Sequence, residues 1–306
     1  MSMARSTTTS VAENKLSFRR IPERIYNHGE LELSASVMTD DYVEHIPLPA
    51  GFSAGRAGFD EFVRMFRVAV PDLTYEVTRF TPDDLIGEGD HVVHHVVGRG
   101  THRGELFGIP PSGRSLDWTE THIGRYADGM LVEHWGQIDV LRILQAIGVV
   151  PGYAPRGPAP VPPAVVDEQP LSPDAMRTLM TRFVDEIWNV GRLEVADEIF
   201  HPAATSPSAP DLPLGGAGVR VIASMMRTAF PDFHMTVEDT VVEYPFVVGR
   251  FSETGTQTGP FMGMPLTGKH VAFGEIGILR VANGQVVESW YDVDMMGLMG
   301  QLGVGG

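Results

Sequence analysis

The chain repeats itself at a constant spacing, and this duplication constrains its fold more than any other feature. The segment 100–110 reads GTHRGELFGIP and the segment 255–265 reads GTQTGPFMGMP, with glycine, threonine and proline at matching places. The offset of 155 residues then holds without a gap as far as Gly148 and Gly303. A repeat of over a hundred residues is too long for one unit of a solenoid. The sequence therefore predicts two similar domains in tandem.

Composition agrees with two globular domains. The 306 residues suffice for two cores, and 43% apolar with 20% charged residues is ordinary for a globular protein. A net charge of −16 would repel phosphates, so we expect neither nucleic acid nor a membrane as partner. No apolar run approaches the roughly 20 residues that span a bilayer. The absence of cysteine excludes disulfides and favours a cytoplasmic protein.

Proline marks the boundary between the copies. Eight prolines lie between Pro151 and Pro173, a density that favours an extended polyproline II linker. Such a linker could reach around a domain, so we expect the two domains to pack as an internal pseudo-dimer, and a further homo-oligomer is left open. The predicted organisation is a disordered tail over 1–12, a first domain over 13–150, a Pro-rich linker over 151–173 and a second domain over 174–306.

Within each copy the sequence predicts helices first and strands afterwards. Apolar residues recur at helical spacing and then alternate with a period of two. Asp128-Gly129 and Asn283-Gly284 are typical of tight hairpin turns. This order predicts an α+β unit whose curved, mostly antiparallel sheet wraps over helices and leaves a conical cavity for a small apolar ligand. The predicted helices are 12–25, 29–38, 58–70, 174–188, 193–200 and 218–230, and the predicted strands of copy 1 are 73–80, 92–99, 116–126 and 130–140.

Both copies resemble a known family. The string GTHRGELFGIPPSGRSLDW, followed by IGRYADGMLVEHWGQID and LQAIG, resembles the SnoaL-like polyketide cyclases, and VESWYDVD near the end of copy 2 is similar to them too. The resemblance implies two tandem cone-shaped α+β barrels of the nuclear transport factor 2-like type. It also implies an enzyme of polyketide antibiotic biosynthesis that closes a ring by intramolecular aldol condensation, without metal or organic cofactor, on a small apolar substrate.

The same resemblance implies a catalytic carboxylate. In family members, the Asp four residues after a Trp acts as acid and base, which corresponds to Asp139 after Trp135 and, by the repeat, to Asp294. A carboxylate in an apolar cone has a raised pKa and can deprotonate a carbon between two carbonyls. The alternative is that Asp139 only caps a following helix over 140–147.

The two copies differ in their imidazoles. His102, His122 and His134 of copy 1 correspond to Gln257, Gly277 and Ser289 of copy 2. Because imidazoles can stabilise an oxyanion or transfer protons near pH 7, we expect copy 1 to hold the main active cavity. His122 is a catalytic candidate, and so is His45, which lies where such cones open.

Strand alternation limits which side chains share the cavity. It places Trp135, Gln137 and Asp139 on one face, with His134 on the outer face unless a bulge intervenes. Neighbouring histidines at 91, 94 and 95 point to both faces of their strand, so we expect no metal site. The predicted substrate-binding residues are Trp118, Trp135, Gln137, His102, Tyr42, Trp290, Asp292 and Glu275.

Two other functions remain open. The first is epoxide opening, as in proteins that resemble limonene-epoxide hydrolase, where paired acids activate a hydroxyl or water. Asp292 and Asp294 on one strand, with Glu275 on its neighbour, could serve in that role. The second is a small-molecule binding protein without catalysis.

Overall fold

The computed structural model describes residues 10–46, 51–81, 85–152 and 160–303. The chain divides into two compact units, residues 1–154 and 155–306, called unit 1 and unit 2 below. The predicted tail lies outside the described residues up to residue 9. Ser10 already caps the first helix and exchanges hydrogen bonds with Glu13, so residues 10–12 are ordered rather than part of a tail. Within the predicted linker, residues 153–159 also lie outside the described residues.

Unit 1 begins with helices and continues with strands. Its predicted helix 29–38 is wrong in extent, since it contains only two short helical turns before a strand, β1, that the sequence did not predict. The helical elements are α1 (Val11–Arg20), the π-helical turn η1 (Ile21–Tyr26), η2 (Leu31–Leu33), α2 (Ser34–Val37), α3 (Gly55–Ala69) and α4 (Val140–Ile147). The strands are β1 (Met38–Glu44), β2 (Thr74–Val77), β3 (Ile86–Glu88), β4 (His91–Thr101), β5 (Ser115–Ala127) and β6 (Met130–Ile138).

Unit 2 repeats this order. Its first predicted helix is again split into an α-helix and a π-helical turn. The helical elements are α5 (Pro173–Arg182), η3 (Phe183–Asn189), α6 (Val195–Ile199), α7 (Gly216–Ala229) and α8 (Met295–Leu302). The strands are β7 (Phe200–Thr205), β8 (His234–Glu243), β9 (Phe246–Thr256), β10 (His270–Ala282) and β11 (Gln285–Val293).

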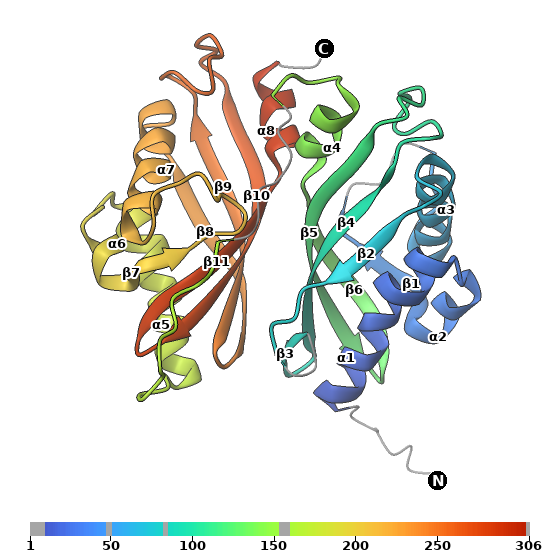
Figure 1. The fold of residues 1–306 in the computed structure, drawn as a ribbon, viewed down its shortest axis with the longest axis horizontal. Helices are drawn as coiled ribbons and strands as arrows, with labels where there is room; N and C mark the ends of the chain where they lie inside the picture. The colour runs from blue at the N-terminus through green and yellow to red at the C-terminus, as the bar shows by residue number, and fades with distance from the viewer. Residues whose placement is uncertain (1–9, 47–50, 82–84, 153–159, 304–306) are drawn as a thin grey trace. The chain divides into compact units, whose positions relative to one another are not determined.

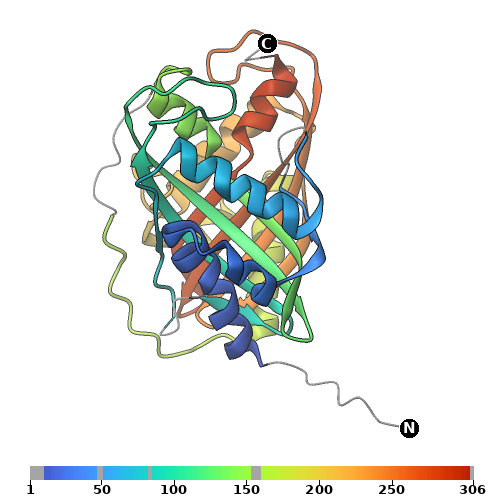
Figure 2. The same cartoon turned by 90° about the vertical axis from the view of Figure 1, so that its right-hand side faces the viewer.

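The sheets have the same topology in both units. The strand order is β1-β6-β5-β4-β2 in unit 1, where β3 also pairs with β4, and β7-β11-β10-β9-β8 in unit 2. Among the described strands, only the pairs β1–β6 and β7–β11 are parallel, so the prediction of two mostly antiparallel α+β units is confirmed. Helix α7 of unit 2 (Figure 1) and helices α1 and α3 of unit 1 (Figure 2) each cover one face of the curved sheet of their own unit.

A β-bulge in the last strand of each unit decides which side chains face the helices. In unit 1, Arg125 pairs with Glu133 but Tyr126 pairs with Leu131, so β6 carries one extra residue. Leu131 lies in the core beneath the helices, and the extra residue places His134 on that same face. The same shift occurs between Arg280 and Val281 in unit 2. The sequence left open whether a bulge places His134 on the inner face, and the structure contains that bulge.

Candidate active site

The cavity of unit 1 is nearly filled by its own side chains. Its volume is about 40 Å³, enough for one or two water molecules. Helix residues such as Tyr26 and Phe59 close it on one side, and strand residues close it on the other. The polar side chains that the strands contribute to it are those of Glu44, Tyr75, His94, Glu120, His122 and His134.

Four of these side chains form a continuous hydrogen-bonded chain. Glu120 Oε2 lies 2.7 Å from His122 Nε2, and His122 Nδ1 lies 3.2 Å from His134 Nε2. His134 Nδ1 then lies 2.8 Å from Glu44 Oε2. All four residues are buried or nearly so, and the buried ones are 5–7% exposed. We call Glu120, His122, His134 and Glu44 the Glu–His–His–Glu chain.

The number of protons in this chain follows from its contacts. Each of the three contacts joins two atoms that need one proton between them, so the chain needs three protons. Two neutral imidazoles supply only two. If both carboxylates are ionised, the third proton makes one of the imidazoles an imidazolium, and the chain has a net charge of −1.

Both carboxylates have further donors that favour their ionised form. Tyr75 and Trp118 donate to Glu120 Oε1 at 2.6 and 2.5 Å, and Tyr42 donates to Glu44 Oε2 at 2.9 Å. Burial alone would raise the pKa of each carboxyl group. The imidazoles and these donors outweigh burial, so the pKa values of Glu44 and Glu120 lie below the usual range.

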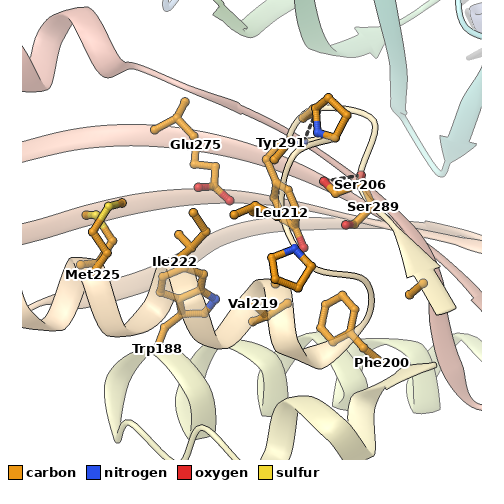
Figure 3. A pocket seen from close by; sticks show the side chains of 18 of the residues that line it. Trp188, Phe200, Ser206, Leu212, Val219, Ile222, Met225, Glu275, Ser289 and Tyr291 are labelled. Atoms are coloured by element: carbon orange, nitrogen blue, oxygen red, sulfur yellow. Dashed lines mark hydrogen bonds between the residues drawn. The ribbon is translucent and has the colours of Figure 1, made fainter. Parts of the chain in front are cut away.

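The larger cavity lies in unit 2. It measures about 290 Å³ and lies between η3 and α7 on one side and β10 and β11 on the other, with the 206–215 segment at its edge (Figure 3). Its lining is mainly apolar and includes Phe183, Trp188, Phe200, Leu212, Ile222 and Phe273. Among the described residues that line it there is no lysine, arginine or histidine. The larger of the two cavities thus lies in copy 2, and the expectation that copy 1 holds the active cavity stays a prediction.

Loss of the Glu–His–His–Glu chain explains the larger volume. His122 and His134 correspond to Gly277 and Ser289, and strand pairing makes Ser206 the equivalent of Glu44. The Ser206 hydroxyl now donates to the Ser289 backbone carbonyl at 3.1 Å. Three large polar side chains are thus replaced by small ones, which leaves room for a ligand.

Unit 2 has a carboxyl pair in place of the carboxylate–imidazole contacts. Glu275 corresponds to Glu120, and Glu253, which lies opposite Phe273 on β9, corresponds to Gly98. Both carboxyl groups line the cavity and are 8% and 3% exposed. Burial is the main cause that raises the pKa of Glu275 to about 7, and the charge of Asp292 adds to it. Burial, then the charge of Glu275 and a hydrogen bond with it, raise the pKa of Glu253 well above its usual range.

Asp139 and Asp294 lie at the N-termini of α4 and α8. Asp139 accepts a hydrogen bond from the Arg142 backbone N–H at 3.1 Å, and Asp294 accepts one from Gly297 at 2.7 Å. Neither is among the residues that line the two cavities described above. The helix cap is thus what the structure shows for both, and their catalytic role stays a prediction.

Several predicted substrate-binding residues lie on the opposite face of the sheet from the cavity. Strand pairing places Trp135 and Gln137 opposite Ile123 and Thr121, away from the face that carries His122. The same shift places Trp290 and Asp292 opposite Ile278 and Ile276, away from Glu275. These four assignments are corrected, because the bulge reverses the alternation that the sequence suggested. The Asp292–Asp294–Glu275 group accordingly does not share one face.

Two further candidates, His45 and His102, lie outside both cavities. His45 stacks on Trp135 at 4.9 Å and pairs with Glu133 at 2.9 Å, so it lies on that outer face. His102 accepts a hydrogen bond from the Ser112 backbone N–H at 3.2 Å and orders a loop, as Gln257 does in unit 2 through Thr267.

Trp118, Tyr42 and His122 belong to the buried interior of unit 1. The first two donate hydrogen bonds to the ends of the Glu–His–His–Glu chain, and His122 is part of it. Of the predicted residues, only Glu275 lines the large cavity.

Sequence reasoning missed Glu44 and Glu253. Glu253 could have been found by comparing the copies, since Gly98 in copy 1 becomes Glu253 at the shared offset. A carboxylate gained on a strand next to Glu275 is informative, because two buried acids perturb each other. Glu44 depends on β1, which the sequence did not predict as a strand.

Two further observations describe the molecule. None of the described helices is both long and apolar enough to cross a membrane. Within the described ranges, no three histidine, cysteine, aspartate or glutamate side chains are grouped so that they could hold a metal ion.

Comparison with known proteins places both units in one family. Solved structures similar to half of the chain include TsrD from Streptomyces laurentii, with 30% identity over 44% of this chain and 98% of TsrD at a TM-score of 0.41. IdmH from Streptomyces antibioticus has 31% identity over 44% of this chain and 98% of its own at a TM-score of 0.38. No curated protein matches the chain. Residues 17–147 and residues 178–302 each match the family described as SnoaL-like polyketide cyclase. The chain therefore belongs to the SnoaL-like polyketide cyclase family, and it carries two copies of the family's domain.

Proposed function

We propose that the chain is a cofactor-independent cyclase of polyketide biosynthesis whose reaction takes place in the cavity of unit 2. The observation that carries this proposal is the Glu253–Glu275 pair, two buried carboxyl groups at the wall of an apolar cavity of about 290 Å³. Family membership supports the reaction class, and the pair supports its location.

The raised pKa values suit the two carboxyl groups to different roles. Because the pKa of Glu275 is about 7, a large fraction of this group is ionised at neutral pH, and it serves as the base. Glu253, whose pKa is raised well above its usual range, retains its proton and serves as the acid. Two like charges held together in an apolar site favour one shared proton.

Ring closure by this pair is balanced in protons. Glu275 takes a proton from a carbon between two carbonyls, and the enolate carbon then forms a bond to a second carbonyl carbon. The resulting alkoxide takes the proton of Glu253. The pair again holds one proton, and the product has the substrate's mass, or that mass less one water if the new hydroxyl is eliminated.

In this proposal unit 1 does not hold the substrate. Its cavity of about 40 Å³ is too small for an organic ligand of polyketide size, because typical ligand pockets measure about 300–1,000 Å³. The cytoplasmic location remains part of the proposal.

The test compares substitutions in the two carboxyl sets. Linear and partly cyclised poly-β-ketones are incubated with the purified chain, and the products are identified by mass spectrometry. We expect Glu275→Gln and Glu253→Gln to lower turnover by about 10²-fold or more. The matched substitutions Asp139→Asn and Asp294→Asn should retain most of it. Loss of turnover in the Asp variants alone, with both Glu variants active, would place the chemistry at Asp139 or Asp294 instead.

Product mass separates the alternatives. With an epoxide as a further substrate, a gain of one water would indicate epoxide hydrolysis, to which the Glu253–Glu275 pair is also suited, since an ionised carboxylate activates water and a protonated one donates to the epoxide oxygen. Opening by a hydroxyl of the same molecule leaves the mass unchanged and would be recognised by the new cyclic ether. Binding without any change of mass would indicate a small-molecule binding protein.

A further inference from the structure

Three buried polar atoms without a hydrogen-bond partner in the protein belong to residues that line the large cavity of unit 2. They are Trp188 Nε1, Thr205 Oγ1 and Glu253 Oε1. The Tyr291 hydroxyl also lines the cavity; its oxygen has a hydrogen bond with the Ser289 side chain, which leaves its O–H as a donor. A buried donor or acceptor without a partner costs about 1–3 kcal/mol, so such atoms are rare in a protein interior. At the wall of a cavity, a bound ligand can supply the missing partner.

Of the side chains that line the cavity, Trp188 restricts most strongly which ligand atom can lie beside it. An indole Nε1–H can only donate, so the ligand atom beside it must be an acceptor. Trp188 is 7% exposed and lies on η3. In Figure 3 its nitrogen is on the side of the ring toward Val219 and away from Met225. Asn189, the next residue, fixes this turn by hydrogen bonds to both the N–H and the carbonyl of Met235, at 2.8 and 3.0 Å.

Tyr291 supplies a second donor from the opposite wall. Burial raises the pKa of Tyr291, so its hydroxyl keeps its proton at neutral pH. Its ring lies over Gly277, where an added Cβ would stand 3.1 Å from the ring, so the phenol is held against the sheet. Two neutral donors therefore border the cavity from η3 and from β11.

The charge of the lining excludes an anionic ligand. Its acidic groups are Glu253 and Glu275, and no cationic side chain among the described lining residues offsets them. An ionised carboxylate or phosphate would meet repulsion without a counter-ion. An uncharged ligand with oxygen acceptors meets none.

We propose that Trp188 Nε1 and the Tyr291 hydroxyl are the donors that bind oxygen atoms of an uncharged, oxygen-bearing aromatic ligand in the cavity of unit 2. Its role in turnover rests on the proposed function, since a donor at the substrate carbonyl would stabilise the enolate formed by Glu275. Binding itself does not depend on that reaction.

The test uses 2-naphthol and naphthalene, two probes that differ by one hydroxyl group and have two fused rings each. Dissociation constants are measured by fluorescence for the full chain and for Trp188→Phe and Tyr291→Phe. We expect 2-naphthol to bind more tightly than naphthalene to the unaltered protein. Each substitution should weaken 2-naphthol binding by about tenfold, the worth of one hydrogen bond, and naphthalene binding by less than about threefold. Tyr244→Phe, at a 37% exposed tyrosine outside the cavity lining, is the matched control and should change neither.

The outcomes distinguish the possible failures. Equal weakening of both probes would overturn the proposal, because Trp188 and Tyr291 would then act through packing alone. Failure of the unaltered chain to bind either probe would also overturn it. If Trp188→Phe fails to fold, as circular dichroism would reveal, Tyr291→Phe alone decides. Glu275→Gln separates this proposal from the proposed function, since it should abolish turnover while 2-naphthol still binds.

Discussion

Glu120 and Glu275 occupy the same place in the repeat, yet their pKa values move in opposite directions. Both are buried, and burial raises the pKa of each. Glu120 also receives hydrogen bonds from His122, Tyr75 and Trp118, which together lower its pKa below the usual range. Glu275 instead faces another carboxyl group. The neighbours, and not the residue type, therefore determine whether this position is a structural anion or a candidate base.

At the residue scale, the proton count of the Glu–His–His–Glu chain predicts an unusual pattern of stability. In Glu120→Gln the amide donates to His122, so two neutral imidazoles can complete all three contacts. Glu44→Gln permits the same from the other end. We expect each single variant to lower the free energy of unfolding of unit 1 by no more than about 1.5 kcal/mol. The measurement is urea denaturation at pH 7.

The double variant is the decisive case. With an amide donor at each end, both protons of the neutral imidazoles are forced into the contact between His122 and His134, where two N–H groups would face each other. We expect a further loss of about 1–3 kcal/mol beyond the sum of the single variants. Additive losses would contradict the proton count.

At the scale of strands, unit 1 and unit 2 exchange large and small residues across one strand pair. His122 faces Gly136 in unit 1, whereas Gly277 faces Tyr291 in unit 2. A Cβ on Gly136 would lie 2.5 Å from His122 Nδ1. Each glycine thus makes room for the ring opposite it. The ring is on β5 in unit 1 (His122) and on β11 in unit 2 (Tyr291), and this difference helps to decide whether the cavity of the unit is filled.

This exchange predicts that Gly136→Ala destabilises unit 1. The added methyl group would displace His122 and disturb its hydrogen bond to His134, so we expect a loss of about 1–3 kcal/mol in the free energy of unfolding. Thermal denaturation at several pH values measures this loss. If the hydrogen bond between His122 and His134 is broken, the melting temperature of the variant should also depend less on pH. Gly300→Ala on α8, where an added Cβ meets nothing within 4 Å, is the control and should be neutral or stabilising by up to about 1 kcal/mol. Equal behaviour of the two variants would show that Gly136 is not needed for packing.

At the scale of the whole molecule, the two units should respond to pH in opposite ways. The folded-state pKa values of Glu253 and Glu275 are raised, so folded unit 2 keeps protons that the unfolded chain releases. The stability of unit 2 therefore falls as pH rises from about 4.5 to about 7. The pKa values of Glu44 and Glu120 are lowered, so their contribution to unit 1 is present above about 4.5 and is lost at lower pH.

Hydrogen exchange read unit by unit tests this difference. Since one pKa unit corresponds to about 1.4 kcal/mol, we expect the raised pKa of Glu275 alone to remove on the order of 3 kcal/mol of protection from unit 2 between pH 4.5 and 8, and the raised pKa of Glu253 to add to this loss, after correction for intrinsic exchange rates. The double variant Glu253→Gln/Glu275→Gln should make this profile flat. A profile of unit 2 that is unchanged by the double substitution would show that other groups cause the pH dependence.

The sequence by itself determined the duplication, the α+β class, the antiparallel hairpins at Asp128 and Asn283, and the family, because these depend on local pattern and on spacing along the chain. Only the tertiary structure decided which copy holds the cavity and which residues line it. The bulge in β6 and β11 reverses strand alternation, which moved His134 inward and Trp135 outward. The Glu253–Glu275 pair and the Glu–His–His–Glu chain depend on contacts across strands, and the volume left between side chains is a property of the packed interior.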